Sequence, residues 1–162
     1  GRSRGRRRHR RPVMAAFLKK IALLTAVALA LAASSIEAAE PVAVIVNRAN
    51  QVDKLTEGEI KKIYTNNTLA WPDGVPIIIY DLSINDQSRT IFSEKILGKA
   101  APLVAEEWAH LKITNQAKNP PQIMKTPTLI IRRVMREKGA IGYVSLGLVQ
   151  NNPDVKVVGT LR

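Results

Sequence analysis

The chain has 162 residues, no cysteine, and 25 lysine and arginine residues against 13 acidic residues, a formal net charge of +12. The absence of cysteine excludes disulfide frameworks, thiolate metal sites, cysteine nucleophiles and a lipid-modified cysteine. The charge is uneven, because residues 1–38 carry nine basic residues and one acidic residue, whereas residues 39–162 carry sixteen and twelve. With a net charge of only +4, the second segment is not expected to bind nucleic acid.

Residues 1–38 have the order of a secretory signal peptide. A lysine pair precedes the apolar run of residues 21–32, and small residues follow this run. The run is shorter than the roughly 20 residues that a membrane-spanning helix needs. We therefore expect translation to start at Met14, cleavage after Ala38, and a periplasmic domain of residues 39–162 with no stable membrane insertion. The alternative is an uncleaved membrane anchor.

The first part of the mature segment alternates apolar runs with helical patterns. Residues 42–46 form a continuous β-branched run, which is typical of a strand buried on both faces of a parallel sheet. A capping box at residues 56–59 predicts a helix that ends near Tyr64. Turn-forming residues 71–74 then lead into a second predicted strand over residues 75–80.

The second part continues the same alternation. Helices are predicted over residues 88–97, from Pro102 onward, and from Pro127 to Gly139, and short strands over residues 140–144 and 155–158. Alternating strands and helices indicate one α/β domain with a mostly parallel sheet flanked by helices.

Enzyme signatures are absent from this sequence. It has no glycine-rich phosphate loop, no nucleophile elbow and no cluster of catalytic carboxylates. His110 lies four residues after Glu106, and one such pair without further ligands is more typical of a solvated helix face than of a metal site. We therefore expect a protein that is not an enzyme, with no catalytic residue, no metal and no cofactor.

Residues 81–90 join the carboxyl end of a predicted parallel strand to the start of a helix, which is where open α/β sheets bind ligands. Ser88 and Thr90 offer hydroxyl groups, Arg89 offers a cation, and the free backbone amides of the first helical turn are expected to point at the cleft. Together these groups predict an oxyanion site. The alternative interpretation is that Ser88 only caps the helix, with Asp86 competing for that role.

Several short motifs occur along the chain in an order that is typical of one family of transport proteins. They lie within residues 42–150 and include residues 55–64, 71–74, Ser88-Arg89-Thr90, Phe92, Leu97-Gly98, Trp108, Pro120-Pro121 and 139–144. Because it has these motifs in this order, the chain resembles the substrate-binding proteins of phosphate ABC transporters. The resemblance implies a periplasmic-binding-protein type II fold, essentially a single lobe of it, and a phosphate-type ligand.

The same resemblance implies a set of ligand-binding residues. Ser88 to Thr90 occupy the place of the family's phosphate-binding Ser-Gly-Thr triplet, with Arg89 replacing glycine. Ile84 stands where the family carries a further phosphate-binding arginine, and Asn47 is expected to stand in partly for a first-lobe loop. The expected ligand-binding residues are Ser88, Arg89, Thr90, Asn85, Asp86, Asn47 and Tyr143.

Two hypotheses about function result. The first is a periplasmic solute-binding protein for phosphate or a related oxyanion, with an ABC transporter permease or another periplasmic protein as its partner. Family members close two lobes around phosphate, so a single lobe is expected to bind at millimolar concentrations, for which about 4 kcal/mol suffices. The alternative is a ligand-independent periplasmic interaction or sensory accessory domain, which Ile84 and the missing first lobe favour.

Overall fold

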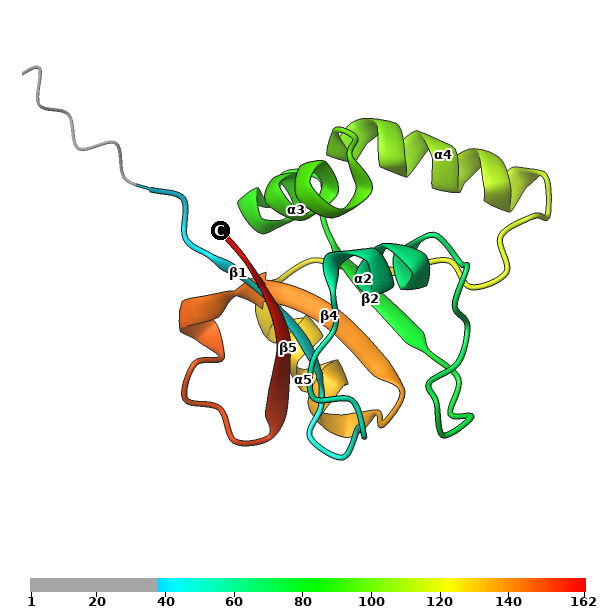
Figure 1. Cartoon of the computed structure of the whole chain (residues 1–162). Coiled ribbons are helices and arrows are strands. Elements are labelled where there is room, and N and C mark those ends of the chain that lie inside the picture. Colours follow the sequence, from blue (N-terminus) through cyan, green and yellow to red (C-terminus); the bar gives the residue numbers. More distant parts are fainter. Residues whose placement is uncertain (1–37) are drawn as a thin grey trace, which may run out of the picture. The chain divides into compact units, whose positions relative to one another are not determined.

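The computed structural model describes residues 38–162, so the predicted signal peptide and Met14 lie outside the described residues. Residues 39–162 form one compact unit. Its elements in chain order are β1 (Val42–Asn47), α2 (Glu57–Tyr64), β2 (Ile78–Leu82), α3 (Gln87–Phe92), the π-helix η1 (Ser93–Leu97), α4 (Ala101–Ile113), β3 (Gln122–Met124), α5 (Pro127–Arg136), β4 (Ala140–Ser145), the 3-10 helix η2 (Leu146–Leu148) and β5 (Val155–Leu161) (Figure 1). No helix in this part of the chain is both long and apolar enough to cross a membrane.

The five strands form one mixed sheet in the order β3-β2-β4-β1-β5. β2 runs parallel to β3 and β4, whereas β1 runs antiparallel to β4 and β5, so four strands share one direction and β1 opposes them. The predicted α/β fold with its mostly parallel sheet is confirmed. The parallel setting expected for β1 itself is wrong, because its continuous apolar run reflects burial on both faces and carries no information on strand direction.

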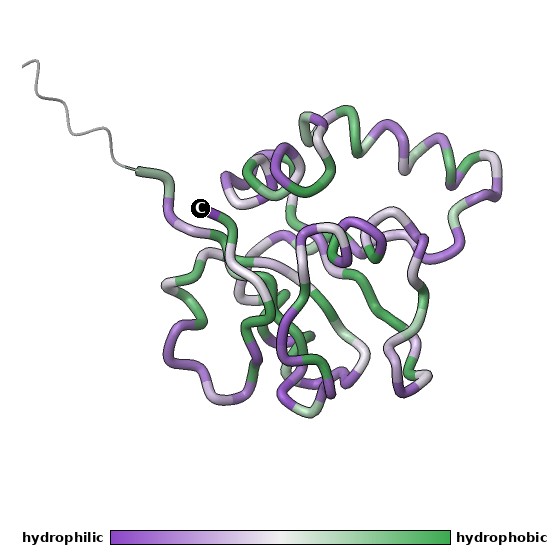
Figure 2. The backbone as a smooth tube through the Cα atoms, in the orientation of Figure 1, coloured by the Kyte–Doolittle hydropathy of each residue, from purple (hydrophilic) through white to green (hydrophobic). Residues whose placement is uncertain are grey.

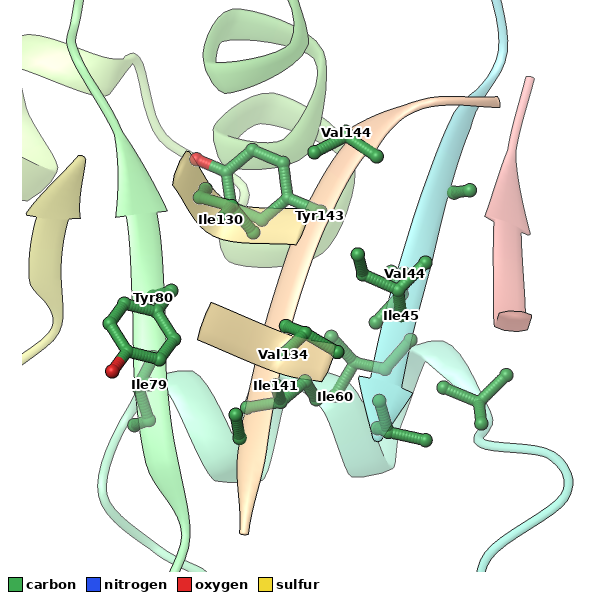
Figure 3. Packing of buried hydrophobic residues seen from close by; sticks show 14 of the residues in the cluster. Val44, Ile45, Ile60, Ile79, Tyr80, Ile130, Val134, Ile141, Tyr143 and Val144 are labelled. Atoms are coloured by element: carbon green, nitrogen blue, oxygen red, sulfur yellow. The ribbon is translucent and has the colours of Figure 1, made fainter. Parts of the chain in front are cut away.

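Helices cover both faces of this sheet. Successive residues of a strand point to opposite faces, and β4 shows this directly. Tyr143 stacks on Phe92 of α3 with ring centroids 4.0 Å apart. Gly142 faces α5, where an added Cβ would lie 2.4 Å from a methyl group of Ile130. Figure 3 shows Ile130 and Val134 of α5 among the buried side chains of the sheet.

Local capping signals predicted several helix ends, although α5 ends at Arg136, three residues before the expected Gly139. Thr56 and Glu59 form the expected capping box of α2, and the Thr126 side chain accepts a hydrogen bond at the start of α5. Gly98 adopts the left-handed conformation, φ 69°, at the end of η1. These confirmed ends depend on neighbouring residues only, which a sequence states directly.

Three strands differ from the prediction, and the simplest case is β5, which was expected over residues 155–158 and extends to Leu161. β2 begins at Ile78, three residues later than expected, because Pro76 bridges Ala70 and the Ile77 amide donates to Leu69. β3 follows the two prolines that were expected only to break the chain. It is a three-residue edge strand held by pairing with β2, which no local pattern announces.

The helix α4 carries apolar residues along its whole length, between polar ones, but most of them are poorly covered. Figure 2 shows apolar segments distributed along it, whereas the strands form the continuous apolar centre of the domain. Only Ala101 and Val104 are buried in α4. Leu103 and Ile113 are 53% and 85% exposed. The carboxyl-terminal part of α4 therefore projects from the body of the domain, as Figure 1 shows.

Candidate functional site

The candidate site lies at the sheet edge where β2, β3 and β4 end. These strands share a direction, so their carboxyl ends lie at the same edge. α3 follows β2 after a short loop, and Ser145 is the last residue of β4. The hydroxyl oxygens of Ser88 and Ser145 are 3.4 Å apart. The fold therefore brings together two hydroxyl groups from different elements.

Asp86, and not Ser88, caps α3. Its carboxylate accepts a hydrogen bond of 2.8 Å from the Ser88 amide, and its backbone oxygen accepts one of 3.2 Å from the Thr90 amide. Aspartate is a favoured N-cap because its carboxylate satisfies a free amide and opposes the positive end of the helix. The first-turn amides were expected to be free and to point at the cleft, but the Ser88 amide is already bonded to Asp86, while the Ser88 hydroxyl lies next to that of Ser145.

Arg89 differs most from its expected position. Its side chain is 2% exposed and forms an ion pair with Asp81, itself 4% exposed. One guanidinium nitrogen also approaches the backbone oxygen of Leu82 at 3.5 Å, and Nε has no hydrogen-bond partner within residues 38–162. The guanidinium is buried with Asp81 and not exposed on the loop, and this pairing stabilises the fold because a buried carboxylate without a partner would be strongly destabilising. Arg89 is thus placed to position the loop.

Tyr143 lies in the same buried network. Its hydroxyl donates to the Asp81 carboxylate and accepts a 3.4 Å hydrogen bond from the Leu82 amide. Burial raises the pKa of Tyr143, and the nearby charge of Arg89 opposes this only in part. The phenol therefore stays protonated and able to donate at neutral pH. Figure 3 shows this hydroxyl directed toward the end of β2, so Tyr143 contacts the buried residues Asp81 and Leu82 of the site and holds them in place.

Asn85 and Thr90 are exposed in the loop and on α3, where a solute can reach them. Asn47 lies elsewhere. Because β1 is antiparallel, Val46 pairs with Ile141 near the start of β4, so Asn47 is at the opposite edge of the sheet. Its side-chain amide donates to backbone oxygens at the end of α5, at 2.8 and 3.0 Å. The expectation that it joins the Ser88 group is corrected by the direction of β1.

Two residues of this site, Ser145 and Asp81, were not predicted from the sequence. Ser145 follows the apolar strand of residues 140–144, and Asp81 follows the apolar residues of β2. Each is a polar residue at the carboxyl end of an apolar run, which is the signal that identifies this edge. The proximity of Ser145 to Ser88 depends on the pairing of β4 with β2, which the sequence does not state, whereas Asp81 meets Arg89 within one strand–loop–helix unit.

An apolar pocket of about 340 Å³ adjoins the loop. Leu82 and Ile84 line it from the loop side, Trp108 from α4 and Ile123 from β3, with Arg89 also in its wall. Ile84 is 46% exposed, so the position that the resemblance assigns to an arginine contributes apolar surface. Within residues 38–162 no group of three potential metal-ligating side chains is present.

Comparison with known proteins places this geometry in a family. The PBP superfamily domain matches residues 36–160. The chain belongs to the PBP superfamily. No curated protein matches it. This membership agrees with the resemblance inferred from the motifs, and it accounts for a mixed sheet flanked by helices.

Solved structures of PBP-like proteins are similar to this chain. One of them is a protein from Clostridium perfringens, described as a phosphate ABC transporter substrate-binding protein with bound phosphate. It is 25% identical in sequence, with a TM-score of 0.59, and the match covers 74% of this chain and 44% of that protein. An ABC-type phosphate transport receptor from Vibrio cholerae is 20% identical, with a TM-score of 0.56 over 74% and 45%. PstS from Borrelia burgdorferi is 15% identical, with a TM-score of 0.58 over 74% and 47%. The chain thus spans less than half the length of these proteins.

Proposed function

We propose that this PBP superfamily protein is exported to the periplasm and binds phosphate or a related oxyanion at the edge that carries Ser88 and Ser145. The observation that carries the proposal is the likeness to the phosphate-bound Clostridium perfringens protein, at 25% identity and a TM-score of 0.59. The predicted signal peptide supports the location. A permease of an ABC transporter is the partner that such a receptor would have.

The chemistry at this edge suits weak binding of a tetrahedral anion. The hydroxyls of Ser88 and Ser145, 3.4 Å apart, can donate to two oxygens of one anion, and exposed Thr90 and Asn85 supply further donors. Arg89 cannot add its full charge because Asp81 already opposes it. We therefore expect a dissociation constant in the millimolar range, for which about 4 kcal/mol suffices.

The test compares two variants of residues 39–162 by NMR titration of backbone amides with phosphate. Replacing both hydroxyls, Ser88→Ala with Ser145→Ala, is expected to raise the dissociation constant at least about tenfold, the effect of losing roughly 1.4 kcal/mol. Thr114→Ala, at the far end of α4, is the matched control and should bind as the wild type does. Unchanged binding by the double variant contradicts the site assignment.

A second candidate function has its own supporting observation. Asp81 opposes the charge of Arg89, and exposed Ile84 adjoins an apolar pocket, which together favour a domain that docks on a periplasmic partner without a ligand. A ligand present at ten times its dissociation constant stabilises a protein by about 1.4 kcal/mol. If about 10 mM phosphate leaves the melting temperature unchanged and one periplasmic protein is captured reproducibly, this second function is favoured.

A further inference from the structure

A pocket of about 440 Å³ lies between the end of α2, the face of α4 that carries Val104 to Leu111, and the segment after α4. It shares no lining residue with the Ser88 and Ser145 edge. α4 is anchored by Ala101 and Val104 only, so its later turns leave a space over α2. The volume falls within the roughly 300–1,000 Å³ that is typical of small-molecule sites.

The inner wall of this pocket is apolar and partly aromatic. Tyr64 is buried, while Leu97, Trp108 and Leu111 are half-buried and Val104 closes the wall from α4. An indole ring offers a flat surface on which another ring can pack, with a gain of about 0.5–1.5 kcal/mol beyond the area buried. The wall therefore suits a flat apolar body.

The rim of the pocket carries an excess of positive charge. Three lysines, Lys61, Lys99 and Lys118, line it together with one glutamate, Glu107. Glu107 pairs with Lys99, and within residues 38–162 neither Lys61 nor Lys118 has an ion-pair partner. Two exposed ammonium groups, those of Lys61 and Lys118, thus remain uncompensated at the rim of an apolar wall, where they can attract an anion.

Hydrogen bonds hold one wall in place without a ligand. The Asn66 side chain donates to the Asn119 backbone oxygen at 2.8 Å and accepts from the Asn119 amide at 2.7 Å. Asn66 adopts a left-handed conformation, φ 59°, which places its side chain for both bonds. The segment that carries Lys118 is therefore fixed against the end of α2, and the pocket is formed in advance.

We propose that this pocket binds an aromatic anion, with its ring on Trp108 and Leu111 and its acidic group on Lys61 and Lys118. The proposal does not depend on phosphate binding, because none of the anion-binding groups assigned to the Ser88 and Ser145 edge lines this pocket; Trp108 alone also lines the apolar pocket beside the loop. It predicts selectivity for a charged aromatic compound over a neutral one of the same shape, and no competition by phosphate.

The test uses two fluorescent probes with residues 39–162. The sulfonate probe 8-anilino-1-naphthalenesulfonate is the aromatic anion, and N-phenyl-1-naphthylamine is its neutral counterpart. The wild type should bind the sulfonate saturably and at least about tenfold more tightly than the neutral probe. Replacing both free lysines, Lys61→Ala with Lys118→Ala, should remove this difference without changing the affinity for the neutral probe. Leu111→Gln should weaken both.

A matched control removes the same charge elsewhere. The control variant is Lys112→Ala with Lys95→Ala. Lys112 lines the 340 Å³ pocket beside the loop and Lys95 is an exposed residue of η1, so this variant should bind the sulfonate as the wild type does. Melting curves of all variants establish that they fold. Equal affinity for the two probes, unsaturable sulfonate binding, or an equal loss in the control variant overturns the proposal.

Discussion

The buried ion pair of Asp81 and Arg89 gives the clearest prediction for individual residues. Both side chains are less than 5% exposed, and the hydroxyl of Tyr143 also donates to Asp81. Arg89→Met leaves the carboxylate buried without its cation, so the free energy of unfolding should fall by about 3–5 kcal/mol. Urea denaturation of residues 39–162 measures this change.

The control for this prediction is the double variant Asp81→Leu with Arg89→Met. It removes both charges together, so it should be less destabilised than Arg89→Met alone, because no unpaired charge stays buried. If Arg89→Met lowers stability by less than about 1 kcal/mol, the guanidinium is accessible to solvent and the positioning role assigned to Arg89 is wrong.

Tyr80 gives a prediction of pH dependence. Its hydroxyl donates to a carboxylate oxygen of Glu137. Burial, together with this hydrogen bond, raises the pKa of Tyr80 from 10.0 to about 12. A raised pKa means that the folded state favours the protonated phenol. This contribution to stability is fully present below about pH 10 and is lost as the pH rises through about 12.

Comparison with Tyr80→Phe isolates this contribution. Stability should decrease between about pH 10 and 12 in both proteins, since burial also raises the pKa values of Tyr64 and Tyr143. The wild type should lose up to about 1.4 kcal/mol more per pH unit than the variant, the slope for one extra proton. Parallel curves for the two proteins contradict the raised pKa.

At this scale the sequence indicated the loop of the candidate site but not where its side chains point. Ser88 and Asp86 were recognised as competitors for the helix cap, and the fold resolves the competition in favour of Asp86. Arg89 looked like an exposed cation because its partner, Asp81, is eight residues away at the end of another element. Burial of a charge depends on tertiary partners, which local sequence does not state.

Among the elements, the contact of α5 with β4 is the most sensitive to a small change. A Cβ at Gly142 would lie 2.4 Å from Ile130, so Gly142→Ala should lower the free energy of unfolding by about 1–3 kcal/mol through overpacking. A Cβ at Gly58 in α2 would meet only the hydroxyl oxygen of Thr56, at 4.0 Å, an ordinary van der Waals contact, so Gly58→Ala should instead add about 0.4–1 kcal/mol. Thermal and urea unfolding of both variants measure the contrast, and equal effects would contradict this packing.

The elements also show which signals a sequence carries. Thr56, Thr126 and Gly98 were each assigned correctly, since caps and helix ends are decided by contacts within a few residues. The direction of β1 was predicted wrongly, because a strand buried on both faces has the same apolar pattern in either orientation. That one direction moves Asn47 from the expected site to the opposite edge of the sheet.

For the whole molecule, the main fact is that one compact unit carries the fold while spanning less than half of each similar structure. The PBP superfamily fold was predictable because several motifs occur in a fixed order along the chain. The strength of anion binding could not be derived from these motifs. It depends on how many donors reach one anion, and the fold provides two close hydroxyls and no free cation from Arg89.

The most direct measurement is a calorimetric titration of residues 39–162 with phosphate at low salt, with sulfate as the comparison. The proposed function predicts saturable binding with a millimolar dissociation constant and a preference for phosphate, and it predicts loss of this signal when Ser88 and Ser145 are replaced. Absence of saturable heat with phosphate up to several times that concentration would contradict the proposal and favour an interaction domain.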